Sequence, residues 1–134
     1  MARSINDIKQ EVDSLTDKLD EPVDEHIKCL VVALRYLDFN TSASCEGHLD
    51  HGFAYPWVDM CYENPKIARQ EKKRLKKLLQ QFIKIRKPNH KPVIKNFADF
   101  RLQFNTEAQT QALLSDYQKT MDDLANFLFD SRHP

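Results

Sequence analysis

The chain has 134 residues, of which 41% are hydrophobic and 30% are charged, and its formal net charge is zero. This length fits one domain, and this composition excludes a disordered chain and favours a globular protein. The longest apolar run, CLVVAL from Cys29 to Leu34, is far shorter than the roughly 20 residues that span a bilayer. The first residues, MARSINDIKQEVD, contain no apolar signal core, so we expect a cytoplasmic protein without a membrane partner.

Hydrophobic periodicity predicts two helices in the first 40 residues. Ser4 and Asp7 resemble a capping box for the first helix. Its apolar seam consists of Ile5, Ile8, Val12, Leu15 and Leu19. This seam is only about two heptads long, which favours packing on the same domain, with a homodimer through the seam as the alternative. Pro22 ends the pattern, and a more apolar helix follows that ends near residues 38–40 and is expected at the centre of the core.

Two short strands are predicted next, at residues 41–46 and 55–62, joined by the loop GHLDHGF. Asn64 and Pro65 are typical of a helix start, and this third helix is expected to end before Pro88. Its apolar side is expected to contain Ile67, Leu75, Leu78, Leu79, Phe82 and Ile83.

The last third of the chain predicts one strand and one helix. The strand is expected from Val93 to Phe104, half-buried because apolar and polar residues alternate in ADFRLQF. Thr106 and Gln109 resemble a capping box that opens the last helix. The order α-α-β-β-α-β-α predicts a single α+β domain over residues 1–134, with a small, largely antiparallel sheet and helices on one face.

The third helix and its following loop form a basic stripe. Residues 66–91 contain eleven Lys and Arg residues against one acidic residue, Glu71. Such a stripe attracts phosphates, so Lys72, Lys73, Lys76 and Lys77 are a candidate phosphate or RNA patch. The alternative is an ordinary solvated helix face.

The stretch TSASCEGHLDHGFAYPWVD, residues 41–59, collects the chemically distinctive residues of the chain. It contains both glycines, the single tryptophan, two of the five histidines and one of the three cysteines. Gly47 and Gly52 flank the two histidines, which indicates sharp turns or a close backbone approach, although an ordinary hairpin would use the same glycines. We therefore expect the functional site here.

Three kinds of chemistry are compatible with this stretch. Cys45 beside His48 would suit a cysteine nucleophile, and His48 with Asp59 would suit general acid–base catalysis, while a small cysteine is also a common core residue. Cys45, His48, His51 and Cys61 have the spacing C-x2-H-x2-H-x9-C, which could bind zinc. The spacing has no pair of closely spaced hooks, so we predict no metal site from it and leave the cofactor open. The three cysteines are odd in number and widely spaced, which predicts reduced thiols.

Aromatic residues next to a carboxylate favour a ligand site. Tyr55, Trp57 and Asp59 would alternate onto one strand face, which suits stacking and hydrogen bonding to a flat ligand such as a nucleobase. A core role for the tryptophan is the alternative. The candidate ligand-binding residues are Ser44, Glu46, His48, His51, Tyr55, Trp57 and Asp59.

The motif SCEGH followed by YPWV resembles a motif of small uncharacterised bacterial proteins, to which no activity is attached. The longer stretch DEPVDEHIKCLVVALRYLDFNTSASCEGH is similar to the N-terminal part of the wyosine-base tRNA methyltransferase family. The matching residues are Asp24, Thr41, Ser42, Ser44, Cys45 and Gly47. The chain departs from the family motif where His48 replaces an arginine, Glu46 replaces a serine and Ala43 is inserted.

The second resemblance implies a related α+β fold. If the activity carries over, it also implies S-adenosylmethionine as cofactor, with Ser44, Cys45 and His48 bordering the pocket for the cofactor and guanosine. The basic stripe would then hold tRNA phosphates.

Three functions follow from these observations. The first is a domain whose hairpin, residues 41–59, binds a small polar or nucleotide-like ligand. The second is an RNA-modifying enzyme of the methyltransferase kind. The third is a protein-interaction module, dimeric through residues 5–19. Whether the protein is an enzyme is left open by the sequence.

Overall fold

The computed structural model describes residues 4–15 and 22–132. Its elements are α1 (Ile5–Asp13), α2 (Glu25–Tyr36), β1 (Thr41–Cys45), β2 (Trp57–Met60), α3 (Pro65–Arg86), β3 (Val93–Lys95), β4 (Phe100–Gln103) and α4 (Gln111–Ser131). The strands form one antiparallel sheet with the order β1-β2-β4-β3. The predicted α+β domain is confirmed, with one strand more than expected. None of the described helices combines the length and the apolar composition of a membrane span.

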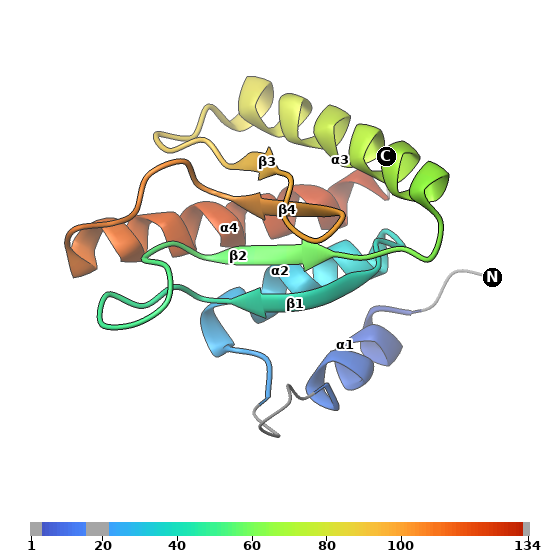
Figure 1. The fold of residues 1–134 in the computed structure, drawn as a ribbon, viewed down its shortest axis with the longest axis horizontal. Coiled ribbons are helices and arrows are strands. Elements are labelled where there is room, and N and C mark those ends of the chain that lie inside the picture. Colours follow the sequence, from blue (N-terminus) through green and yellow to red (C-terminus); the bar gives the residue numbers. More distant parts are fainter. Residues whose placement is uncertain (1–3, 16–21, 133–134) are drawn as a thin grey trace.

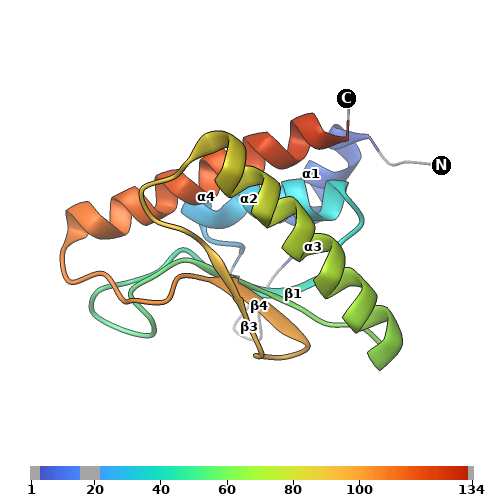
Figure 2. The same cartoon turned by 90° about the horizontal axis from the view of Figure 1, so that it is seen from above.

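The described helices lie on one side of the sheet, and none of them covers the other side, the open face (Figures 1 and 2). α2 packs against α4, and α1 packs against α2. The core between the two layers includes Val58, Met60, Phe100 and Leu102, all fully buried. These four residues lie on neighbouring strands and share a face, because Val58 pairs with Leu102 and Met60 pairs with Phe100. Strand alternation then directs Trp57, Asp59 and Arg101 to the open face.

The single strand predicted from Val93 to Phe104 is wrong, because the chain reverses direction within it. Residues 96–99 form the turn of a hairpin in which β3 pairs antiparallel with β4. Asp99 stabilises this turn, since its carboxylate accepts a hydrogen bond from the backbone N–H of Tyr62 at 2.6 Å. The prediction of a half-buried strand is also wrong: all four residues of β4 are buried, including Arg101 and Gln103.

The predicted start of the last helix is four residues too early. α4 begins after Thr110, whose side chain accepts a hydrogen bond from the N–H of Leu113. Residues 105–109 remain a loop because two of them form hydrogen bonds to the loop between β1 and β2. The N–H of Ala108 donates to the carbonyl of Ala54, and the carboxylate of Glu107 accepts from the N–H of Ala54.

α1 and α3 begin where the sequence predicts. Ser4 caps α1 by accepting a hydrogen bond from Asp7, and Asn64 caps α3 with Pro65 in its first turn. α1 ends at Asp13, earlier than the seam predicted, and Leu19 lies outside the described residues. In α3, Ile67 is exposed, which contradicts its predicted place on the apolar side of the helix.

Candidate functional site

The loop between β1 and β2 folds back on itself at Gly47. This residue has a φ angle of +89°, and a Cβ atom there would lie 2.7 Å from the backbone carbonyl carbon of Tyr55. The N–H of His48 donates to the carbonyl of Phe53 at 3.1 Å, which closes the loop. Gly52 also has a positive φ angle, +62°, but its surroundings are open. The structure thus confirms both predicted turns and assigns the close backbone approach to Gly47.

Cys45, His48 and Asp24 converge where β1 ends beside the first turn of α2. One ligand atom from each of the three side chains lies within 4.8 Å of the other two. The Nε2 atom of His48 is 3.7 Å from Oδ2 of Asp24. Sequence analysis named Asp24 only as a match to the methyltransferase family. It gave Asp24 no site role of its own, because Asp24 lies 21 residues before Cys45.

Asp24 is the N-cap residue of α2, yet its carboxylate does not cap its own helix. It accepts a hydrogen bond from the N–H of Glu46 at 3.0 Å. Glu46 makes the reciprocal contact, since its carboxylate accepts from the N–H of His26 in the first turn of α2. The carbonyl of Glu46 also accepts from Gln118 of α4 at 3.0 Å. Glu46 therefore has a structural role here, and the Asp24 carboxylate is directed toward Cys45 and His48.

The surroundings of Cys45 favour the thiol over the thiolate. Burial raises the pKa of Cys45, and the carboxylate of Asp24 raises it further, by its charge and by accepting a hydrogen bond. The N–H of Gly47, 3.4 Å from the sulfur, acts in the opposite direction. Since the thiolate is the nucleophile, this environment does not favour the nucleophilic role predicted for Cys45 with His48.

His51 lies against His48 at the tip of the loop. The two imidazole rings are stacked with their centroids 4.3 Å apart. The Nδ1 atom of His51 is 2.8 Å from Oδ1 of Asp50, and both of these side chains are exposed. His51 thus supports one face of the His48 ring.

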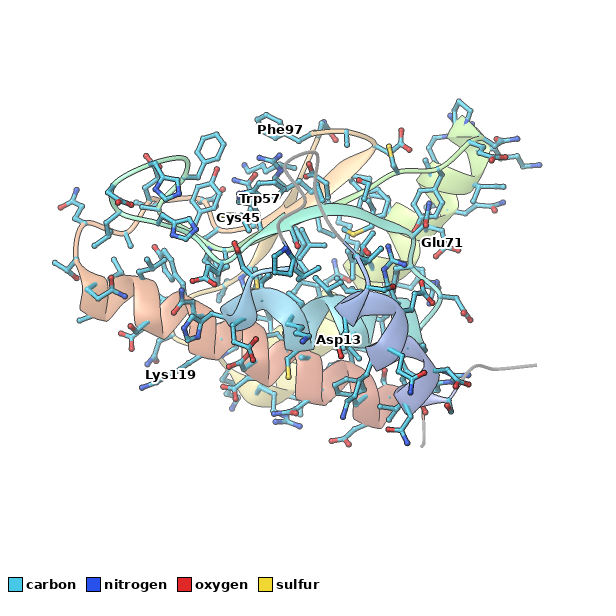
Figure 3. The ribbon with its side chains drawn as sticks, turned by 90° about the horizontal axis from the view of Figure 1, so that it is seen from below. Asp13, Cys45, Trp57, Glu71, Phe97 and Lys119 are labelled. Carbon is cyan, nitrogen blue, oxygen red and sulfur yellow. The ribbon has the colours of Figure 1, made fainter. Side chains whose placement is uncertain are left out.

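A cavity of about 640 Å³ lies next to this cluster. The edge strand β1 lines it along its whole length, together with Asp24, His48 and His51. Phe53 and Trp57 add aromatic rings to its wall. Figure 3 shows Cys45 and Trp57 near one another on the side of the sheet that faces away from the helices. The cavity thus brings together four of the seven predicted ligand-binding residues: Ser44, His48, His51 and Trp57.

Asp59 lies elsewhere in the structure, in a buried ion pair with Arg101. The Arg101 guanidinium donates to both carboxylate oxygens of Asp59, at 2.5 and 2.9 Å. It lies 4.0 Å from the ring centroid of Trp57 and 4.4 Å from that of Phe97, so aromatic rings cover it. The structure thus pairs Asp59 with Arg101, and His48 with Asp24, in place of the predicted pairing of His48 with Asp59.

Arg101 was missed by sequence analysis as a partner of this region. Asp59 and Arg101 each alternate with apolar residues along a strand, which is a signal that could have suggested an ion pair. The sequence alone does not show that β2 and β4 are neighbours, so the pairing could not be predicted. Tyr55 is also placed differently from the prediction, because β2 begins only at Trp57. Tyr55 is buried before the strand and stacks on Phe53 with centroids 5.3 Å apart.

The four-ligand zinc pattern is not assembled. Cys61 follows the last residue of β2, and its N–H donates to the carbonyl of Asn40 at 3.1 Å. Cys45 pairs with Trp57 at the first residue of β2, so the two cysteines lie at opposite ends of this strand pair. All three cysteines are free, as the sequence predicts.

The basic residues of α3 lie apart from the cavity. Lys73, Lys76 and Lys77 are exposed, while the ammonium of Lys72 donates to the side chain of Asn96 in the turn between β3 and β4. α3 flanks the β3 side of the sheet, whereas β1 forms the opposite edge (Figure 1). The predicted phosphate patch and the cavity are therefore on different sides of the domain.

No protein-family model matches this chain, and neither does any curated protein or solved structure. The resemblances to the wyosine-base methyltransferases and to the small bacterial proteins accordingly remain predictions.

Proposed function

We propose that this chain is a small-ligand-binding domain and that its site is the cavity beside β1. One observation carries the proposal: side chains from three separate segments line one cavity of about 640 Å³. These side chains are Asp24, Cys45, His48 and Trp57. This volume lies in the range of roughly 300–1,000 Å³ that small-molecule sites occupy. A few polar groups on an aromatic and apolar wall are typical of such sites.

The wall favours a flat ligand with hydrogen-bonding edges. Trp57 and Phe53 offer ring faces for stacking, and Ser42 and Ser44 offer hydroxyl groups. Among the described residues that line the cavity, Arg35 is the sole Lys or Arg, and its guanidinium is bonded to Glu11 and Thr41. In the metal-free chain, a phosphate would lack an unpaired Lys or Arg partner in the described part of the wall, and the Asp24 carboxylate would repel it. The ligand class that fits is therefore a nucleoside-like molecule without phosphate.

Trp57 provides a direct test, because it is the only tryptophan of the chain. We expect a saturable change in its fluorescence when the full chain is titrated with adenosine, guanosine or S-adenosylmethionine. Binding of adenosine and guanosine 5′-monophosphates to the metal-free chain should be at least about tenfold weaker than binding of the nucleosides, a difference of about 1.4 kcal/mol. A clear preference for S-adenosylmethionine over adenosine would instead favour the methyltransferase alternative.

His48→Ala leaves Trp57 in place as the fluorescent reporter. This change should weaken nucleoside binding about tenfold, since it removes a polar group from the cavity wall. Phe97→Ala is the matched control, because Phe97 covers Arg101 on the open face but does not line the cavity. Equal affinities in the two variants, or no saturable signal with any of these compounds, would refute the proposal.

A further inference from the structure

We propose that Asp24, Cys45 and His48 bind a divalent transition-metal ion of the zinc type, with the remaining coordination position facing the cavity. The inference deepens the proposed function and rests on it, because the ion would form part of the wall against which the ligand lies.

The spacing of the three donors suits a tetrahedral ion. Zinc binds imidazole nitrogen and carboxylate oxygen at about 2.0–2.2 Å and thiolate sulfur at about 2.3 Å, so neighbouring ligand atoms lie about 3.3–3.7 Å apart. His48 Nε2 lies 3.7 Å from Asp24 Oδ2, and a ligand atom of each of Asp24, Cys45 and His48 lies within 4.8 Å of the other two. Small side-chain rotations would bring the three donors to bonding distance of one ion.

Backbone contacts hold the donors in place before any ion binds. Cys45 is the last residue of β1, and its sulfur accepts from the N–H of Gly47. Asp24 is held by the N–H of Glu46, and His48 is held by the bond from its own N–H to Phe53. An aspartate at a helix N-cap ordinarily accepts hydrogen bonds from its own helix. Here Glu46 takes that role, which leaves Asp24 to face the thiol and the imidazole.

The donor set selects the type of ion. Thiolate and imidazole suit zinc and neighbouring transition metals, whereas Mg²⁺ and Ca²⁺ prefer sites made of oxygen alone. Three protein ligands with one open position are the arrangement of zinc sites that contact a substrate, while structural zinc sites use four protein ligands. Asp24, Cys45 and His48 all line the cavity, so a molecule bound there has access to the open position.

Cobalt and zinc titrations of the full chain test this ligand set. We expect one ion per chain, with the proton of the Cys45 thiol released to the buffer as the sulfur binds the ion, and with Co²⁺ the sulfur-to-metal charge-transfer absorption that reports a thiolate ligand. Cys45→Ser should abolish this absorption, and Asp24→Asn and His48→Ala should each weaken zinc binding at least about tenfold in calorimetry. Circular dichroism checks that each variant is folded.

Two neighbouring residues serve as matched controls. Cys61→Ser should leave both the absorption and the affinity unchanged, because Cys61 is at the far end of β2. His51→Ala should change zinc affinity less than His48→Ala does, because His51 groups with Asp50 and His48 and is not one of the three donors around Cys45. No bound ion, an ion bound without the sulfur band, or equal dependence on His51 and His48 would overturn the inference.

The two proposals fail in distinguishable ways. If the metal-free chain binds nucleosides but neither Zn²⁺ nor Co²⁺, the metal inference is wrong and the proposed function stands. If the chain binds one ion through Cys45 but binds no nucleoside in either its metal-bound or its metal-free form, the metal site stands and the proposed ligand class is wrong.

Discussion

Cys45 is half-buried at the end of β1 next to the carboxylate of Asp24. Burial and this carboxylate raise the pKa of Cys45, so its thiolate fraction at pH 7.5 is smaller than that of an ordinary cysteine. We predict that iodoacetamide modifies Cys45 more slowly than the exposed Cys29 and Cys61 in the metal-free chain. Mass spectrometry of the three peptides measures the rates.

The pH profile separates protonation from access of the reagent to the sulfur. The Cys45 rate should keep rising with pH above the range in which the rate of an ordinary cysteine levels off. Asp24→Asn should shift the Cys45 profile toward lower pH, because it removes a negative charge next to the sulfur. A Cys45 that reacts fastest of the three at neutral pH would contradict this prediction and restore the nucleophile hypothesis.

Gly47 combines a positive φ angle with a close approach to the Tyr55 backbone. Gly47→Ala is expected to lower the free energy of unfolding by about 2–4 kcal/mol, because the new Cβ would meet the Tyr55 backbone at 2.7 Å. Gly52→Ala shares the positive φ angle but has open space around it, so about 1 kcal/mol is expected there. Urea unfolding measures the free energy of unfolding of both variants. An equal loss in the two would show that the Tyr55 backbone moves away from the new Cβ.

The buried ion pair couples β2 to β4 on the open face of the sheet. Asp59→Ala should lower the free energy of unfolding by about 3–5 kcal/mol, because it leaves the Arg101 guanidinium buried without its partner. The double variant Asp59→Leu with Arg101→Met should recover most of this loss, since it removes both charges together. Thermal and urea unfolding of the three variants test the coupling. A double variant as unstable as Asp59→Ala would mean that the loss comes from packing.

At the scale of whole elements, periodicity located all four helices, and caps located two of their starts. Ser4 and Asn64 lie in extended segments with no competing partner for their side chains, so local chemistry decides where those helices begin. Thr106 failed as a start because the nearby Glu107 and Ala108 bind Ala54, about 50 residues away. The β3–β4 turn was missed for the same reason, because Asp99 stabilises it through Tyr62.

At the scale of the whole molecule, the apolar seam of α1 packs inside the domain. Ile8 and Val12 are buried, at 1% and 0% exposure, in a helix that packs against α2. We predict that Ile8→Ala lowers the free energy of unfolding by about 2–4 kcal/mol without changing the sedimentation mass of the chain. Asn6→Ala on the exposed side of the same helix is the control and should change neither quantity. A loss of mass in Ile8→Ala from dimer to monomer would support the interaction-module hypothesis.

The sequence by itself determined the α+β class, the location of the helices and the stretch that holds the candidate site. It could do so because helix and strand periods, caps and glycine turns are local properties of the chain. Only the tertiary structure decided which side chains meet. It brought Asp24 to Cys45 and His48, took Asp59 to Arg101, and separated Cys61 and the basic helix from the cavity. These contacts join strands and helix ends distant in sequence, and strand order and the packing of α2 beside β1 set them.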